Sequence, residues 1–134
     1  MKSLVEKVRS SLPALDKHGL IYLYALFERE DATGKWDIVL SSEWSDKDAT
    51  SANKLVSSEV VPLLNREELA ALSRVIVIPS TAPAITAMSS AINVDEGSLE
   101  VQDCNFSGLQ IKHAFVFRCK RPISKSQLSE AITE

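Results

Sequence analysis

The sequence predicts a single α+β domain in which a mixed five-stranded sheet packs with four to five helices. The length of 134 residues is typical of one domain. Five segments are rich in β-branched or aromatic residues, and five others combine a helix-start signal with apolar residues on one helical face. The strands are predicted to form two β-hairpins and one central strand. We expect one domain over residues 1–134, with a frayed end at about 130–134.

Four of the predicted helices begin with a capping box, in which a Ser or Asn is followed three residues later by a side chain that reaches back. These helices cover about 3–12, 46–61, 66–72 and 125–133. Pro13 ends the first and Pro62 ends the second, because proline lacks the amide hydrogen that a helix interior needs. A fifth helix is predicted from about 83 to 92, where Pro83 suits the first turn.

The predicted strands are 20–30, 35–42, 74–79, 98–103 and 109–119. Residues 74–79 are apolar on both sides of the chain, which indicates a central strand covered on both faces of the sheet. The helical connection from 35–42 to 74–79 predicts that these two strands run parallel. Alternation along 109–119 predicts one buried face, with His113 on the same side as Cys119.

Charge decides the register that we predict for the first hairpin. A three-residue loop at 32–34 sets Arg29 opposite Asp37, whereas a four-residue loop would set Glu28 opposite Asp37 and bring two like charges together. The shorter loop is therefore predicted, with Arg29 and Asp37 as a structural ion pair. Asp37 is not expected to be a catalytic acid, because surface ion pairs far outnumber catalytic carboxylates. Glu43 also lies about 20 Å away along the strand, too far for the two to form a catalytic carboxylate pair.

Composition argues against several classes of protein. The net charge of −3 disfavours a dedicated nucleic-acid binder, because phosphate neutralisation normally needs a basic surplus. The apolar run at 20–27 is far shorter than the roughly 20 residues that cross a bilayer, so no membrane partner is expected. Charged residues near the start occupy positions that are apolar in a signal peptide, and we expect a cytoplasmic protein. No disulfide is predicted, because the hairpin separates Cys104 from Cys119.

No catalytic, metal or cofactor constellation is evident in the sequence. The residues with zinc-type ligands are scattered rather than grouped: His18, Cys104, His113 and Cys119. A Cys–His nucleophile would need one of these thiols beside His113, and the strand spacing opposes this arrangement. The glycines form no phosphate-binding loop. We therefore predict no metal and no cofactor, and the sequence leaves catalytic activity open while favouring a protein that is not an enzyme.

One group of polar residues remains as a candidate ligand site. If strands 35–42 and 74–79 are parallel, both end at one edge of the sheet, and each is followed by a helix start. The residues gathered there would be Ser41, Ser42, Glu43, Trp44, Ser45, Ser80 and Thr81. Helix amino termini attract anions, which would suit a polar or anionic ligand. The alternative is that these hydroxyls only cap helices and that Trp44 covers the edge of the core.

Charge is unevenly spread along the chain, which suggests a surface for a partner. Residues 28–48 are mostly acidic, whereas residues 104–129 carry bases and no acid. The candidate partner contacts are Lys112, Arg118, Lys120 and Arg121. The leading hypothesis is a regulatory, adaptor or immunity-type module that acts through protein–protein contacts, and the alternative is a small-ligand-binding domain or small enzyme that uses the strand exits. Edge-strand pairing into a homodimer is also compatible with the sequence.

Overall fold

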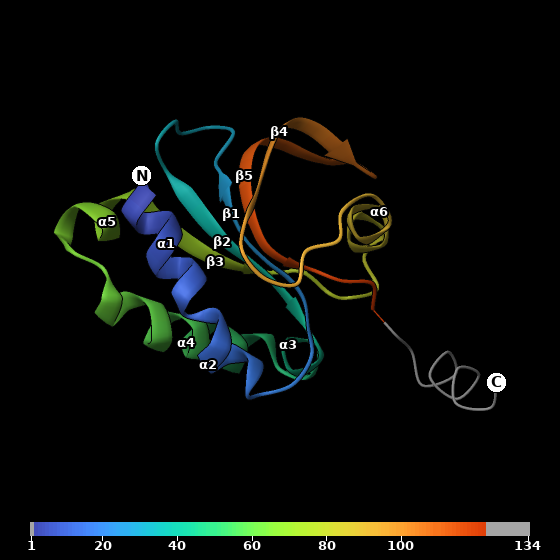
Figure 1. The fold of residues 1–134 in the computed structure, drawn as a ribbon, viewed down its shortest axis with the longest axis horizontal. Helices are drawn as coiled ribbons and strands as arrows, with labels where there is room; N and C mark the ends of the chain where they lie inside the picture. The colour runs from blue at the N-terminus through green and yellow to red at the C-terminus, as the bar shows by residue number, and fades with distance from the viewer. Residues whose placement is uncertain (1, 123–134) are drawn as a thin grey trace.

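The computed structural model describes residues 2–122 and has a single-domain α+β fold with a five-stranded mixed sheet, as predicted (Figure 1). The strand order is β3-β2-β1-β5-β4, and neighbours are antiparallel except for the parallel pair β2 and β3. The strands are β1 (Ile21–Glu28), β2 (Trp36–Ser42), β3 (Leu72–Val77), β4 (Leu99–Phe106) and β5 (Leu109–Cys119). The predicted helix at 125–133 and the frayed end at about 130–134 lie outside the described residues.

The helices are α1 (Lys2–Ser10), α2 (Leu12–Asp16), α3 (Glu43–Lys47), α4 (Ala49–Val60), the 3₁₀ turn η1 (Val61–Leu63), α5 (Arg66–Ala71) and α6 (Pro83–Ala91). Two predicted helices are each divided. The first resumes after Ser11 as α2, with Pro13 in its first turn, where proline needs no amide partner. The second begins earlier, as α3, and breaks at Asp48, whose carboxylate accepts from the amide of Ser51 (3.1 Å) and caps α4. No helix within residues 2–122 is long and apolar enough to cross a membrane.

The sheet separates two hydrophobic cores, so the fold has three layers (Figure 1). Helices α1, α2 and α4 cover the first core on one face, and α6 covers the second core on the other. Trp36, Ile38 and Leu40 point into the first core and Val39 into the second, as alternation along a strand requires. Because both faces of β1 and β2 are buried, their sequences are almost continuous apolar runs.

The strand that was predicted to be central, 74–79, lies instead at an edge of the sheet. β3 pairs with β2, and its other side has no strand neighbour among residues 2–122. Its two-sided apolar pattern arises because Val75 and Val77 pack against the first core while Ile76 and Ile78 pack against the second. Helices on both faces therefore give an edge strand the pattern of a central one.

The predicted pairing of Arg29 with Asp37 is wrong. Asp37 lies opposite Phe27 in the first hairpin, so the connecting loop is longer than expected. Arg29 instead donates two hydrogen bonds of 2.9 Å to the carboxylate of Asp31. Asp37 forms its ion pair with Arg74 of β3, at 3.3 Å between Nε and Oδ1. The prediction compared charges only across the hairpin, whereas the parallel neighbour supplies the compensating charge.

His113 and Cys119 lie on opposite faces of the sheet, contrary to the predicted alternation. The His113 ring contacts Trp36 on the side of the first core, with ring centroids 5.2 Å apart, whereas Cys119 belongs to the second core. The pairing of β5 with β1 shifts register after Tyr24, which inserts an extra residue in β5 and reverses the alternation beyond it. Cys119 and Cys104 are both free thiols.

Candidate functional site

The ends of β2 and β3 lie side by side, as predicted for parallel neighbours. The amide of Ile78 donates to the carbonyl of Leu40 (2.8 Å) just before the two strands end. Ser80 then donates through its amide (2.9 Å) and its hydroxyl to the carboxylate of Asp46 in α3. The loop that follows β3 is therefore tied to the helix that follows β2.

Two of the candidate serines at this edge act as helix caps. Ser42 Oγ accepts from the amide of Ser45, and Ser45 Oγ accepts from the amide of Ser42, both at 2.9 Å. This reciprocal pair is a capping box at the start of α3, and both side chains are buried. The two hydroxyls are thus engaged within the chain, as the capping alternative expects.

The other candidates at the strand exits differ in exposure. Ser41 is buried, and neither its Oγ nor Nε1 of Trp44 has a hydrogen-bond partner among residues 2–122. The Trp44 ring packs near His18, with ring centroids 5.8 Å apart. Glu43 and Thr81 are exposed. The fold brings these exits together, but a ligand at this edge stays a prediction.

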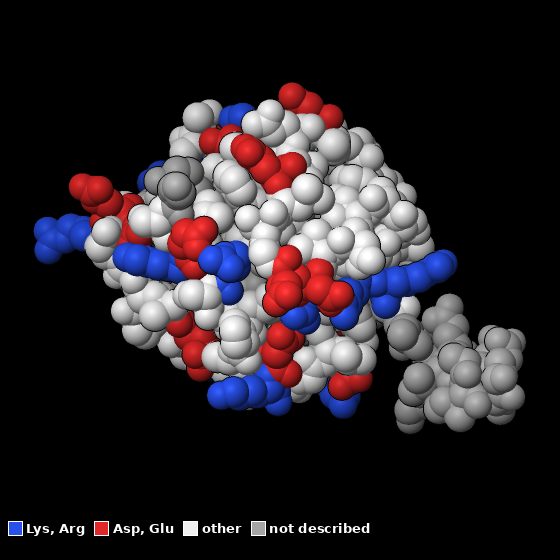
Figure 2. Space-filling view, in the orientation of Figure 1, with Lys and Arg blue, Asp and Glu red and all other residues white. Residues whose placement is uncertain are grey.

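Most of the basic residues proposed as partner contacts form ion pairs within the chain. The pairs are Lys112 with Glu28, Arg118 with Asp16 and Lys120 with Asp95. Arg118 donates two hydrogen bonds, of 2.8 and 3.0 Å, in the bidentate geometry that arginine favours. Arg121 is exposed. On the face drawn in Figure 2, acidic and basic side chains are interleaved, so the separation of charge along the sequence does not persist there.

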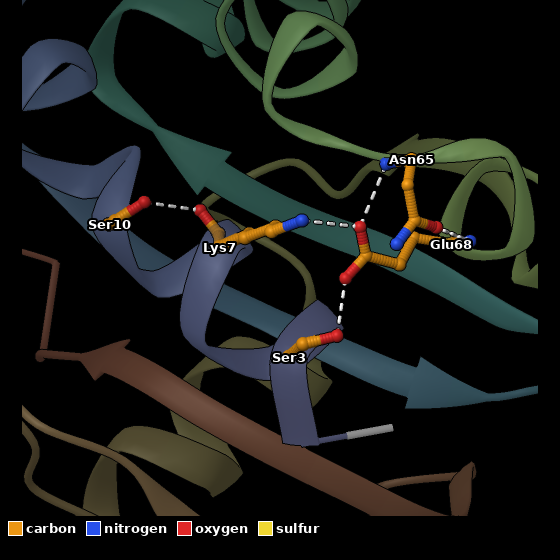
Figure 3. Close-up of polar contacts among 5 residues, drawn as sticks. All are labelled: Ser3, Lys7, Ser10, Asn65 and Glu68. Carbon is orange, nitrogen blue, oxygen red and sulfur yellow. Dashed lines mark hydrogen bonds and ion pairs between the residues drawn. The ribbon is translucent and has the colours of Figure 1, made fainter.

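A buried carboxylate, that of Glu68 in α5, joins α5 to α1 (Figure 3). Its Oε1 accepts from the amide of Asn65 (2.8 Å) and from Nζ of Lys7 (2.6 Å), and its Oε2 accepts from the hydroxyl of Ser3. These donors, the Asn65 amide above all, lower the pKa of Glu68 from 4.5 to about 2. A general acid must carry a proton near neutral pH, so Glu68 has the properties of a structural anion instead.

Burial removes the thiol of Cys119 from nucleophilic chemistry. Cys119 lies in the second core, and burial raises its pKa from 9.0 to about 11. The thiol is therefore protonated near neutral pH, whereas the thiolate is the form that attacks. Within the described part of the chain, no group of three His, Cys, Asp or Glu side chains is arranged to hold a metal ion.

An open groove runs along the outer edge of β3, between that strand and α4, and we call it the β3 groove. It consists of two hollows, of about 350 and 320 Å³, that share Asn53 of α4. Val61 and Leu69 line the second hollow and are 42% and 41% exposed. Leu63, in η1 with Val61, is also 42% exposed. Apolar side chains are therefore open to solvent beside a strand edge that has no strand neighbour among residues 2–122.

Sequence reasoning missed the β3 groove because it placed β3 at the centre of the sheet. One signal was present in the apolar residues on either side of Pro62. Val60 and Val61 are consecutive, as are Leu63 and Leu64, and the buried face of one helix takes only some residues of such a run. Val60 and Leu64 are buried in the structure, whereas Val61 and Leu63 are exposed.

Comparisons with known proteins give no relative for this chain. No protein-family model matches it, and neither the curated proteins nor the solved structures yield a match. Any functional assignment therefore depends on the surface and the chemistry described above.

Proposed function

We propose that this protein acts by binding another protein through the β3 groove. The observation that carries the proposal is the exposure of Val61 and Leu69 in the groove beside β3, whose outer edge has no strand neighbour among residues 2–122. Scattered apolar side chains are normal on a protein surface, but a group of them on one surface is typical of an interaction site. The edge strand adds backbone hydrogen-bonding groups to the same surface.

The chemistry of the described residues supports a binding role rather than catalysis. Glu68 keeps its charge and Cys119 keeps its proton near neutral pH. The hydroxyls of Ser42 and Ser45 cap α3, and Ser80 binds Asp46. A regulatory, adaptor or immunity-type module in the cytoplasm is the class of protein that we propose.

Affinity purification from the cells that make this protein tests the proposal. The wild-type chain should retain a protein partner in stoichiometric amount, and Leu69→Lys should lose it. Leu99→Lys is the matched control, because Leu99 is 42% exposed on β4, at the opposite edge of the sheet. Both variants should keep an unfolding midpoint close to that of the wild type, since both leucines are about equally exposed and a lysine there can extend its ammonium group into solvent. Recovery of only monomer or homodimer, or loss of the partner in Leu99→Lys alone, would overturn the proposal.

A further inference from the structure

The backbone of β3 presents hydrogen-bonding groups to its outer edge at every second residue. In a parallel pair of strands, alternate residues direct their N–H and C=O groups toward the neighbour. The amide of Ile78 donates to Leu40 of β2, which places Ile78 and Ile76 in the inner row. Val75 and Val77 therefore direct their N–H and C=O groups outward, along the β3 groove.

Asn53 of α4 covers one of these outward-facing backbone groups. Its Nδ2 donates to the carbonyl of Val75 (3.1 Å) and bridges the groove between its two hollows. Outside the ladder that pairs β3 with β2, no hydrogen bond among residues 2–122 is donated by the amides of Val75 and Val77. An unpaired edge accepts another strand readily, and a side chain that covers one of its carbonyls limits unwanted pairing. The edge is thus partly protected and partly available.

The walls of the groove specify the side chains that would suit an added strand. The second hollow is lined by Val61 and Leu69, which would contact apolar side chains. Lys54 lines the first hollow and Arg74 the second, and neither hollow is lined by an acidic residue. The side chain of Arg74 is 57% exposed and pairs with Asp37, and Arg74 also lines a separate hollow with Glu28, Glu30 and Asp31. Within the two hollows of the β3 groove, Lys54 and Arg74 therefore favour acidic side chains in the partner.

We propose, on the basis of the proposed function, that the β3 groove binds an extended segment of another protein in which apolar and acidic side chains alternate, and that this segment adds to β3 as a further strand. Its backbone amide replaces Nδ2 of Asn53 at the carbonyl of Val75. Successive side chains of a strand point to opposite sides, so the apolar ones enter the hollows while the acidic ones reach Arg74. A second copy of this chain suits the edge less well, because it would bring two sets of Lys54 and Arg74 together.

The first experiment uses a short capped peptide of alternating glutamate and valine, titrated into the isotope-labelled full-length chain. We expect saturable amide shifts along β3 and α4, and hydrogen exchange at Val75 and Val77 slowed roughly tenfold or more, because both amides gain acceptors. The same peptide N-methylated on both of its edges should bind roughly tenfold more weakly or not at all, because it lacks backbone donors. A lysine–valine peptide should also bind more weakly, because it reverses the charge.

Two variants test the same contact from the side of the protein. Val77→Pro removes an outward-facing amide hydrogen but leaves the backbone groups of Ile76 and Ile78 that pair with β2. It should therefore weaken peptide binding roughly tenfold. Asn53→Ala removes the competing donor at Val75 and should tighten binding severalfold. Unfolding midpoints check that both variants fold. If Val77→Pro does not fold, the N-methylated peptide decides the question with the wild-type chain.

Each outcome distinguishes strand addition from the broader protein-binding role. Equal binding of the N-methylated peptide, no binding of any peptide, or shifts confined to another surface would overturn strand addition. Self-association that Val77→Pro abolishes would replace the acidic partner with a second copy. A cellular partner that Leu69→Lys loses, without peptide pairing at β3, would keep the proposed function and remove only this inference. Peptide pairing without any cellular partner would count against the proposed function instead.

Discussion

Removing Arg74 should destabilise the protein more than neutralising Asp37. Asp37 is 4% exposed, and Nε of Arg74 lies 3.3 Å from its Oδ1. That contact lacks hydrogen-bond alignment, and Oδ1 has no hydrogen-bond partner among residues 2–122. The positive charge of Arg74 is therefore the main compensation for the carboxylate. Arg74→Met leaves a buried charge uncompensated, whereas Asp37→Asn removes the charge itself.

The expected magnitude lies between those of buried and exposed ion pairs. Removing one partner costs about 3–5 kcal/mol in a buried pair, whereas an exposed pair contributes about 0.2–1 kcal/mol. Since the side chain of Arg74 is 57% exposed, solvent screens much of this interaction. We expect a loss of about 2 kcal/mol in the free energy of unfolding for Arg74→Met and less than about 1 kcal/mol for Asp37→Asn. The double-mutant cycle should give a coupling of about 1 kcal/mol.

Urea unfolding followed by tryptophan fluorescence measures these differences, because Trp36 adjoins Asp37 in β2. Arg9→Met is the control, since Arg9 pairs with the exposed carboxylate of Glu6 in α1 rather than with Asp37. Its unfolding midpoint should match that of the wild type. A wild-type midpoint for Arg74→Met, or a coupling indistinguishable from zero, would refute this account of Asp37.

Three other substitutions test the buried contacts. Glu68→Gln should flatten the acid limb of the stability profile: because the folded pKa of about 2 lies below the ordinary 4.5, ionised Glu68 stabilises the fold fully above about pH 4.5, and this contribution is lost as the pH falls toward 2. Unfolding midpoints measured from pH 7 to pH 2 check this, and an unchanged slope would contradict it. Ser42→Ala should cost about 1 kcal/mol in urea unfolding through loss of the α3 cap, whereas wild-type stability would argue against capping. Phe117→Ala should cost about 3–5 kcal/mol, because it empties a fully buried site beside Tyr24; a loss below about 1 kcal/mol would show that the core can refill the site.

Short-range signals located the helix starts where a pair of capping residues or a proline in the first turn was unambiguous, as in α5 and α6. Asn65 and Glu68 form the predicted capping box, because each lies within one turn of the other. The capping box predicted before the helix at 46–61 begins at Ser45, yet in the structure Ser45 is the third helical residue of a box that begins at Ser42. A serine hydroxyl serves either role, so the choice depended on where β2 ends. Local propensity does not fix that point to within a turn.

The candidate site could not be predicted in full because it depends on strand order. A strand with helices on both faces has the same apolar pattern at the edge of a sheet as at its centre, so residues 74–79 gave no sign of a free edge. Without that edge, neither the outward groups of Val75 nor the role of Asn53 could be foreseen. The parallel neighbour also supplied Arg74 to Asp37, a contact between strands far apart in the sequence.

The position of β3 also bears on the order in which the sheet assembles. β1 with β2 and β4 with β5 are hairpins that close over short loops, whereas β3 reaches β2 only after the chain from Ser42 to Leu72 has been brought back. Closing that longer loop costs more chain entropy and slows pairing. We therefore expect β3 to join the first hairpin only after that hairpin has formed, and, as an edge strand, to open more often than β2 in native-state hydrogen exchange. A strand bound at this edge would then lower the frequency of that opening and turn β3 from an edge strand into an interior one.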